Sequence, residues 1–230
     1  MERYLFLFFT LAFLLAALFI YVIRPDLRRF MLRIGVLGGI AGLICEYWYF
    51  QDYWRPPTLF GTATLSIEDF LFGFAIVSLG ATAGLAALGK KHAPRVKGAG
   101  KKLLLVVLFA VVTNIVMVNI LGINSIIATY VIFGTIAALG LILHPQLWKM
   151  ALISAGVLMA IAFVSYFIVF GLIDPSYVGK YFLLTNNSFL PTLGGFMPIT
   201  ELIWYALWGI ASTVILNLVN GRRNTFQATA

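Results

Sequence analysis

Two short segments of the chain place carboxyl groups at the start of a long apolar stretch. Residues 66–72 read SIEDFLF and residues 198–204 read PITELIW, so the acids are Glu68, Asp69 and Glu201. Each segment opens about twenty residues of membrane-spanning character, where a carboxylate costs on the order of 2.5–3.5 kcal/mol at the helix centre and less near its ends. Because burial favours the neutral form of a carboxyl group, Glu68 or Glu201 could hold a proton near neutral pH and donate it as a general acid.

Aromatic side chains follow both acids at helical spacing. Phe72 comes four residues after Glu68, and Trp204 and Tyr205 come three and four residues after Glu201, so the rings can share a helix face with the acid. The faces of such rings stabilise a carbocation by cation–π attraction and, unlike a nucleophile, do not trap it. An acid in an apolar, aromatic cavity therefore suits the protonation of an alkene.

This pattern defines a candidate site. The candidate catalytic residues are Glu68 as the leading proton donor, with Asp69 and Glu201 as partner acids. The candidate substrate-binding residues are Glu46, Trp48, Phe72, Trp204, Tyr205 and Trp208. Other interpretations stay open. The acids could cap helices beside lipid headgroups, Glu46 could pair with a polar group inside the bundle, and the aromatic run at 47–54 is typical of a membrane-interface belt.

The composition excludes a soluble globular domain. Of 230 residues, 62% are hydrophobic and only 10% are charged, and the mean hydropathy is +1.00. A soluble protein of this size could not cover its surface with so few polar groups. The net charge of +8 is interpreted as a sign of membrane topology rather than of nucleic-acid binding. The one cysteine, Cys45, excludes an intrachain disulfide and is expected to be a small packing residue.

Hydropathy predicts an all-α, polytopic membrane protein with seven transmembrane helices in a single domain, residues 1–230. The predicted spans are residues 4–23, 30–50, 67–88, 102–121, 125–143, 147–172 and 198–219. The first is interpreted as a retained span rather than a signal peptide, because it is too long for the apolar region of a signal peptide and basic residues follow it.

Basic residues are distributed unevenly between the two sides of the predicted membrane domain. All of the 16 Lys and Arg residues except Arg3, Arg55 and Lys180 fall in the loops 24–33 and 89–102 or elsewhere on the same side. The acids show the opposite preference. The positive-inside rule then predicts that the N-terminus lies outside and the C-terminus in the cytoplasm. The chain is expected to be an integral protein of the plasma membrane.

The chain also contains an internal repeat. Residues 24–29 (RPDLRR) resemble residues 144–149 (HPQLWK), and an apolar span, an outer loop and an acid motif follow each of them. Repeat 1 covers residues 4–88 and repeat 2 covers residues 125–219, with a single linker helix at 102–121. Because one connecting helix restores the chain direction, the pattern predicts a parallel 3+1+3 repeat whose two acid motifs could face one cavity.

Residues 48–54 (WYFQDYW), Gly61 and the motif at 66–72 together resemble the small integral-membrane lycopene cyclase domain of the heterodimeric or fused type. The hallmark of that family is a P-[LI]-E-E-x-x-F-F-like segment after an outer loop that contains aromatics and Asp. Residues 24–29 are also similar to the family, and residues 198–204 resemble a second copy of the hallmark. The resemblance thus covers nearly the whole chain as two fused three-span units.

The chain departs from the hallmark at three positions. Ser66 stands where the family has proline, Asp69 where it has the second glutamate, and Thr200 where the second copy would carry its first glutamate. The resemblance implies cyclisation of the linear ψ end groups of lycopene to ionone rings. Such a reaction proceeds by protonation, ring closure and proton loss, with no net redox change.

The expected partners are a carotenoid or other polyprenyl lipid and membrane lipids, with no nucleic acid; a homo-oligomer stays open. No cofactor is expected, although a reduced flavin stays open, and no metal site is expected because His92 and His144 fall in basic loops far from the acids. The alternatives are a non-catalytic carotenoid- or isoprenoid-binding membrane protein, a membrane terpene cyclase and a small transporter. Few ionisable groups lie in the inner half of the spans, which argues against proton-coupled transport.

Overall fold

The computed structural model of the chain describes residues 1–61, 65–91, 98–184 and 191–220. Within these residues, seven helices are long and apolar enough to cross a membrane, which confirms the helical, seven-span prediction. They extend over Glu2–Ile23, Pro25–Asp52, Ile67–Ala87, Ala99–Ile120, Ser125–Leu143, Pro145–Ile173 and Ile199–Val219. Their ends lie within a few residues of the predicted ones, because the hydrocarbon thickness sets the length of an apolar run.

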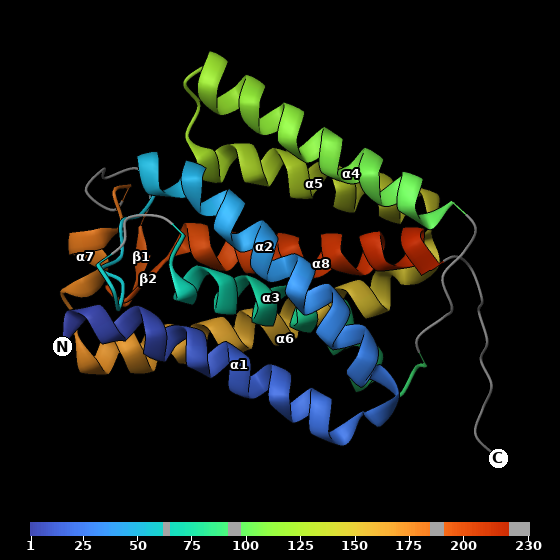
Figure 1. Ribbon diagram of the computed structural model, residues 1–230, viewed down its shortest axis with the longest axis horizontal. Helices are drawn as coiled ribbons and strands as arrows, with labels where there is room; N and C mark the ends of the chain where they lie inside the picture. The colour runs from blue at the N-terminus through green and yellow to red at the C-terminus, as the bar shows by residue number, and fades with distance from the viewer. Residues whose placement is uncertain (62–64, 92–97, 185–190, 221–230) are drawn as a thin grey trace.

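The helices and strands carry the labels of Figure 1. The long α-helices are α1 (Leu5–Ile23), α2 (Arg28–Asp52), α3 (Ile67–Ala87), α4 (Ala99–Asn114), α5 (Ser125–Leu143), α6 (Trp148–Tyr166) and α8 (Ile199–Asn220), and α7 (Tyr177–Tyr181) is short. Turns of 3-10 helix at Glu2–Tyr4, Pro25–Leu27 and Pro145–Leu147 precede α1, α2 and α6, and π-helical segments at Ile115–Ile120 and Phe167–Ile173 extend α4 and α6. A small antiparallel hairpin, β1 (Thr192–Leu193) and β2 (Met197–Pro198), pairs Thr192 with Pro198 and Leu193 with Met197.

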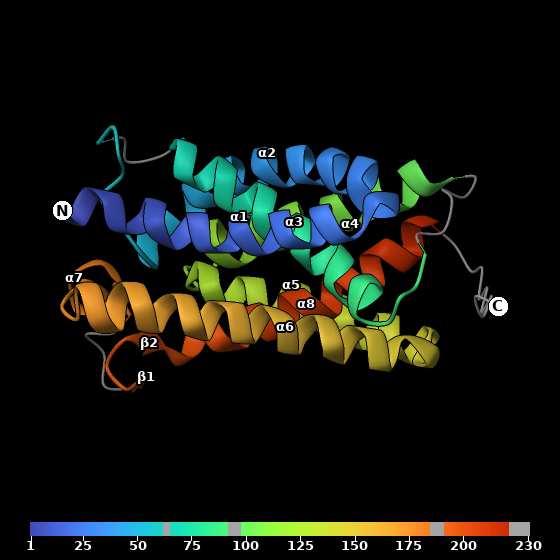
Figure 2. The same cartoon turned by 90° about the horizontal axis from the view of Figure 1, so that it is seen from below.

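The helices α3 and α8 lie at the centre of the bundle (Figures 1 and 2). The helices α1 and α2 pack against α3, α5 and α6 pack against α8, and α4 packs outside on α5 and α8. Consecutive long helices alternate in direction, so the acid motifs at the starts of α3 and α8 lie at the same end of the bundle. We call this the acidic end, and we call the opposite end, where Arg24, Lys90 and Lys149 lie, the basic end.

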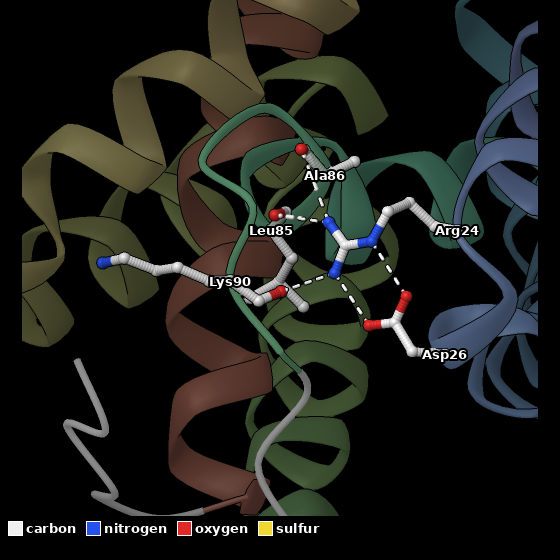
Figure 3. A network of polar contacts seen from close by, with 5 residues as sticks. All are labelled: Arg24, Asp26, Leu85, Ala86 and Lys90. Carbon is white, nitrogen blue, oxygen red and sulfur yellow. Dashed lines mark hydrogen bonds and ion pairs between the residues drawn. The ribbon is translucent and has the colours of Figure 1, made fainter. Parts of the chain in front are cut away.

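At the basic end, hydrogen bonds from Arg24 link the turn between α1 and α2 to the end of α3 (Figure 3). Its guanidinium donates to the backbone oxygens of Leu85 at 2.9 Å, Ala86 at 3.4 Å and Lys90 at 2.7 Å, and to the Asp26 carboxylate at 2.9 and 2.8 Å. The last carbonyls of a helix have no partner within it, so a cation there satisfies them and interacts favourably with the helix dipole. The hydrogen bonds to Asp26 raise the pKa of Arg24 above its ordinary value, which keeps the guanidinium charged.

At the acidic end, the segment after α2 pairs with the segment after α7. Trp54 and Phe182 form an isolated antiparallel bridge, and Leu183 N donates to the backbone oxygen of Tyr53 at 2.8 Å. The Phe182 ring also contacts the rings of Tyr53 and Trp54, with centroids 5.7 and 5.4 Å apart. We call these paired segments, residues 53–55 and 181–183, the outer cap. They close this end of the described bundle with aromatic side chains.

The helices α2 and α3 approach each other closely through glycines. A Cβ atom on Gly38 would lie 2.5 Å from the backbone oxygen of Gly73, and one on Gly42 would lie 2.6 Å from the backbone oxygen of Asp69. Small residues at such positions let two membrane helices pack with their backbones close together. This contact brings the first turns of α3 beside the half of α2 that carries Glu46.

We expect Gly38→Leu to destabilise the bundle, because a side chain in this space overpacks the α2–α3 contact at a typical cost of about 1–3 kcal/mol. The measurement is unfolding in mixed micelles by titration with a denaturing detergent, followed by circular dichroism. Gly156→Leu in α6 is the matched control, since a Cβ atom there meets nothing within 4 Å. Equal midpoints for the two variants would contradict the close contact.

Candidate functional site

A cavity of about 210 Å³ lies among α1, α2, α3, α5, α6 and α8, in the half of the bundle nearer the acidic end. Its lining is mainly aliphatic and aromatic. Concave apolar sites with a few convergent polar groups are the usual form of small-molecule sites. The polar and aromatic residues of the lining are Glu46, Tyr49, Tyr53, Trp54, Asp69, Phe72, Phe133, Tyr166, Glu201, Trp204, Tyr205 and Trp208, with Phe6 and Phe9 from α1.

Three carboxyl groups reach this cavity from three helices. Glu46 comes from α2, Asp69 from the first turn of α3 and Glu201 from the first turn of α8, and their relative exposures are only 6%, 5% and 9%. Among the described residues, no Lys, Arg or His lines the cavity. Buried acids in a cleft without a neutralising cation are frequent at sites of proton transfer.

Phenol groups surround the carboxyl group of Glu201. The Tyr53 hydroxyl donates to Glu201 Oε1 at 2.5 Å and is 2.8 Å from Thr200 Oγ1. The hydroxyls of Tyr166 and Tyr205, both buried, interact with the same carboxyl group. Burial, followed by the nearby Glu201 charge, raises the pKa of Tyr53 well above its ordinary value. The Tyr53 phenol therefore keeps its proton and acts as a donor to Glu201.

Glu46 has a sparser set of partners. Its Oε2 accepts one hydrogen bond in the described structure, a long one of 3.3 Å from Trp54 Nε1 in the outer cap. The group also lies within electrostatic range of both Asp69 and Glu201. Glu46 is thus a buried acid beside two others, with much weaker hydrogen bonding than Glu201 receives.

Asp69 has a structural task in addition to its place on the cavity. Its Oδ2 accepts from Ser66 N at 3.1 Å and from Ser66 Oγ at 2.7 Å, while Asp69 N donates to Ser66 Oγ at 3.0 Å. This reciprocal pair is a capping box at the start of α3. The open interpretation of the motif acids as helix caps therefore describes Asp69, whose carboxyl group still lines the cavity.

Glu68 lies elsewhere. It is fully buried but is not part of the cavity lining, and its Oε1 accepts from Leu59 N at 2.6 Å. Its Oε2 has no hydrogen-bond partner among the described residues. Successive residues on a helix point about 100° apart, so Glu68 and Asp69 face different neighbours. The structure thus places Glu68 outside the lining that Asp69 and Glu201 share, and its predicted role as the leading proton donor stays a prediction.

The predicted aromatic residues divide in the same way. Phe72, Trp204, Tyr205 and Trp208 line the cavity, whereas Trp48 does not. Trp48 Nε1 instead donates to Asn119 Oδ1 at 3.0 Å, which ties α2 to the π-helical end of α4. The cavity aromatics are packed as a stack, since the Trp204 ring lies 6.4 Å from both the Phe72 and the Trp208 ring centroids.

Several lining residues are absent from the predicted set of site residues. Tyr49, Tyr53 and Trp54 belong to the aromatic run at 47–54, where a membrane-interface belt was the default interpretation. Their spacing gave a usable signal, because Glu46, Tyr49 and Tyr53 recur every three or four residues on one helix face. Phe133 of α5 carried no signal of its own.

The described residues contain no group of three or more His, Cys, Asp or Glu that could hold a metal ion. The three cavity acids therefore do not form a metal-binding cluster in this structure. His144 lies at the basic end, far along α5 from the cavity, and His92 lies outside the described residues. A scan against protein-family models and searches of curated proteins and of solved structures found no match to the chain.

Proposed function

We propose that the chain is a membrane-embedded enzyme of the lycopene cyclase type, which cyclises an end group of a carotenoid or other linear polyprenyl chain by acid catalysis. The observation that carries the proposal is the cavity in which Glu46, Asp69 and Glu201 meet stacked aromatic rings, with no basic side chain in the described lining. A general acid beside ring faces is what alkene protonation requires.

The hydrogen-bond partners of the acids suggest their roles. Glu46 receives one long hydrogen bond, which suits a neutral acid, and Glu201 receives several from phenols, which suit a carboxylate. In the proposed reaction, Glu46 gives its proton to the terminal C=C bond, whose π electrons form the new C–H bond. A second C=C bond of the chain then attacks the cation and closes the ring.

Loss of a proton completes the proposed reaction. Glu201 takes a proton from a carbon next to the ring cation, and the C–H electrons form the ring double bond, so the product is an isomer of the substrate. The proton then returns from Glu201 to Glu46, since both carboxyl groups line the same cavity. Because no electron is gained or lost overall, the scheme consumes no oxidant or reductant, and we propose it without a cofactor.

The stacked aromatic rings support the proposal because they can stabilise the carbocation intermediate. Trp204, Trp208 and Phe72 line the cavity beyond the acids, and a ring face attracts a cation by about 2 kcal/mol when water is excluded. The indole N–H groups are already occupied, since Trp204 Nε1 donates to Tyr49 Oη and Trp208 Nε1 to the backbone oxygen of Ile76, both at 3.0 Å. The rings therefore offer π faces rather than donors to the ligand.

The internal repeat and the orientation belong to the same proposal. The turns Pro25–Leu27 and Pro145–Leu147 have the same form, and each follows a residue of similar backbone angles, Arg24 (φ −125, ψ 75) and His144 (φ −136, ψ 64). The α1–α3 and α2–α3 contacts also have counterparts in α5–α8 and α6–α8. These observations support a parallel 3+1+3 repeat. The gathering of Arg24, Lys90 and Lys149 at the basic end supports an orientation with that end in the cytoplasm and the acidic end outside.

The test is expression in bacteria that make lycopene, with pigments separated by chromatography. We expect ring-containing products in cells that carry the chain and lycopene alone in cells with an empty vector. Unchanged lycopene in the cells, together with lycopene bound to the purified protein, would favour the non-catalytic binder instead. Conversion by purified protein only after addition of reduced flavin would contradict the cofactor-free scheme.

A further inference from the structure

The cavity has a side that faces the membrane. The helices α2 and α5 are held together near the acidic end, where Ser125 donates to Asp52 through Oγ at 2.5 Å and through N at 2.9 Å, and Tyr49 Oη lies 2.7 Å from Thr129 Oγ1. Towards the basic end the two helices diverge, and α8 lies behind the space between them (Figure 1).

The residues along this space belong both to the cavity and to the surface. Ala41 and Cys45 of α2 line the cavity and are exposed. Phe133 of α5 and Trp208 of α8 line it and are half-buried, with ring centroids 5.0 Å apart. Because α2 and α5 are membrane-spanning helices, an opening between them leads into hydrocarbon rather than water.

The two ends of the cavity are blocked in the part of the chain that the structure describes. Towards the acidic end, Trp54 of the outer cap packs edge-on against Phe6, with centroids 4.7 Å apart, and both line the cavity. Towards the basic end, the backbone of α2 at Gly38 packs directly against α3, and Trp208 Nε1 donates a hydrogen bond to the backbone oxygen of Ile76. Access from the side is thus more direct than access along the bundle axis.

The size of the cavity limits what can enter. Pockets for drug-sized ligands have about 300–1,000 Å³, and this cavity of about 210 Å³ is smaller. It has room for the end of a long polyprene but not for the whole chain. We propose that a linear isoprenoid inserts one end between α2 and α5 while the remainder of the chain stays in the bilayer. This inference rests on the proposed function for the identity of the ligand, but it does not need turnover.

Photo-crosslinking tests the lateral entry on the full chain in phosphatidylcholine vesicles. The probe is a linear isoprenoid hydrocarbon with a diazirine at its end or, in a second version, at its middle. We expect the end-labelled probe to mark Glu201 and Tyr205, which are the buried α8 residues of the cavity lining. The mid-labelled probe should mark α2 near Cys45, α5 near Phe133, or lipid. If both probes mark Glu201 and Tyr205 equally, the whole chain lies inside and the inference is overturned.

Filling the opening gives a second measurement. Ala41→Trp and Cys45→Trp should lower labelling of α8 by the end-labelled probe by about tenfold, because a large side chain there excludes the ligand and tenfold corresponds to about 1.4 kcal/mol. Leu37→Trp and Ile44→Trp are matched controls, since both positions are exposed on α2 outside the cavity lining. Labelling of the filled variants at the level of the controls would overturn lateral entry.

The result separates lateral entry from the proposed reaction. End-specific labelling in a chain that makes no cyclised product supports the entry route and contradicts the enzyme. Cyclised product without labelling of α8 by the end-labelled probe overturns the entry route and leaves the enzyme. The probe peptides are mapped on the unmodified chain, so the test does not depend on the folding of any variant.

Discussion

Glu46→Gln and Glu201→Gln should each reduce cyclised product by about 10²–10⁴-fold, the usual contribution of a general acid or base. Glutamine keeps the size and the hydrogen-bond acceptor of each side chain but cannot donate or accept the transferred proton. In the proposed cycle Glu46 begins the reaction and Glu201 ends it, so either change slows turnover. The measurement is the ratio of cyclised pigment to lycopene per amount of folded protein in the membrane.

Glu68→Gln is the matched control for these variants. Glu68 has the same side chain and similar burial, but it lies outside the cavity lining and holds the backbone N–H of Leu59. The amide oxygen of glutamine can accept that hydrogen bond, so we expect conversion close to that of the unmodified chain. Loss of product in Glu68→Gln, with conversion retained in Glu46→Gln and Glu201→Gln, would refute the assigned roles and favour Glu68 as the leading acid.

The spans could be predicted because they depend only on the length and composition of one continuous stretch of sequence. An apolar run long enough to cross hydrocarbon is visible in the sequence, and Ser125–Leu143 agrees with its predicted span at both ends. The 3-10 turns were harder to predict. Pro25 marks the start of one, and the predicted span began later, at residue 30, because Arg28 and Arg29 lower the hydropathy there.

The site was only partly predictable because a motif does not specify the helix face that each of its residues occupies. Glu68 and Asp69 are neighbours in sequence, yet only Asp69 lines the cavity. The rotation of α3 about its own axis decides which of the two acids faces the cavity. It is set by the glycine contact with α2, which is a tertiary effect, and by the capping box with Ser66, which is a local one. The capping box was visible in the sequence, since Ser66 and Asp69 have its three-residue spacing.

The distant partners of Glu201 could not be deduced from local spacing. Tyr53 lies in the loop after α2, and Tyr166 lies at the end of α6, and both reach Glu201 only because α2, α6 and α8 enclose one cavity. Helical periodicity relates residues within one helix and carries no information about which helices meet. Glu46 and Glu201, which carry the proposed chemistry, are therefore brought together by packing rather than by any motif.

Tyr53→Phe should reduce cyclised product by about 10–100-fold, because a hydrogen bond to a charged group contributes about 1.5–3 kcal/mol. The change removes the hydroxyl that donates to Glu201 Oε1 at 2.5 Å and contacts Thr200 Oγ1, while the ring that packs against Phe182 stays. Without this donor, the Glu201 carboxylate is less stable and its orientation is less fixed. Both effects make it a poorer acceptor of the ring proton.

Tyr130→Phe separates this effect from a general loss of packing around Thr200. The Tyr130 hydroxyl donates to the backbone oxygen of Thr200 at 2.6 Å, and Tyr130 does not line the cavity. The Tyr130→Phe substitution therefore removes a hydrogen bond from the same turn of α8 and leaves the hydrogen bonds of the Glu201 carboxyl group in place. If the two variants lose conversion equally while binding lycopene equally, Tyr53 stabilises the turn rather than the carboxylate. If only Tyr53→Phe loses conversion and still binds lycopene, the phenol acts on the base itself.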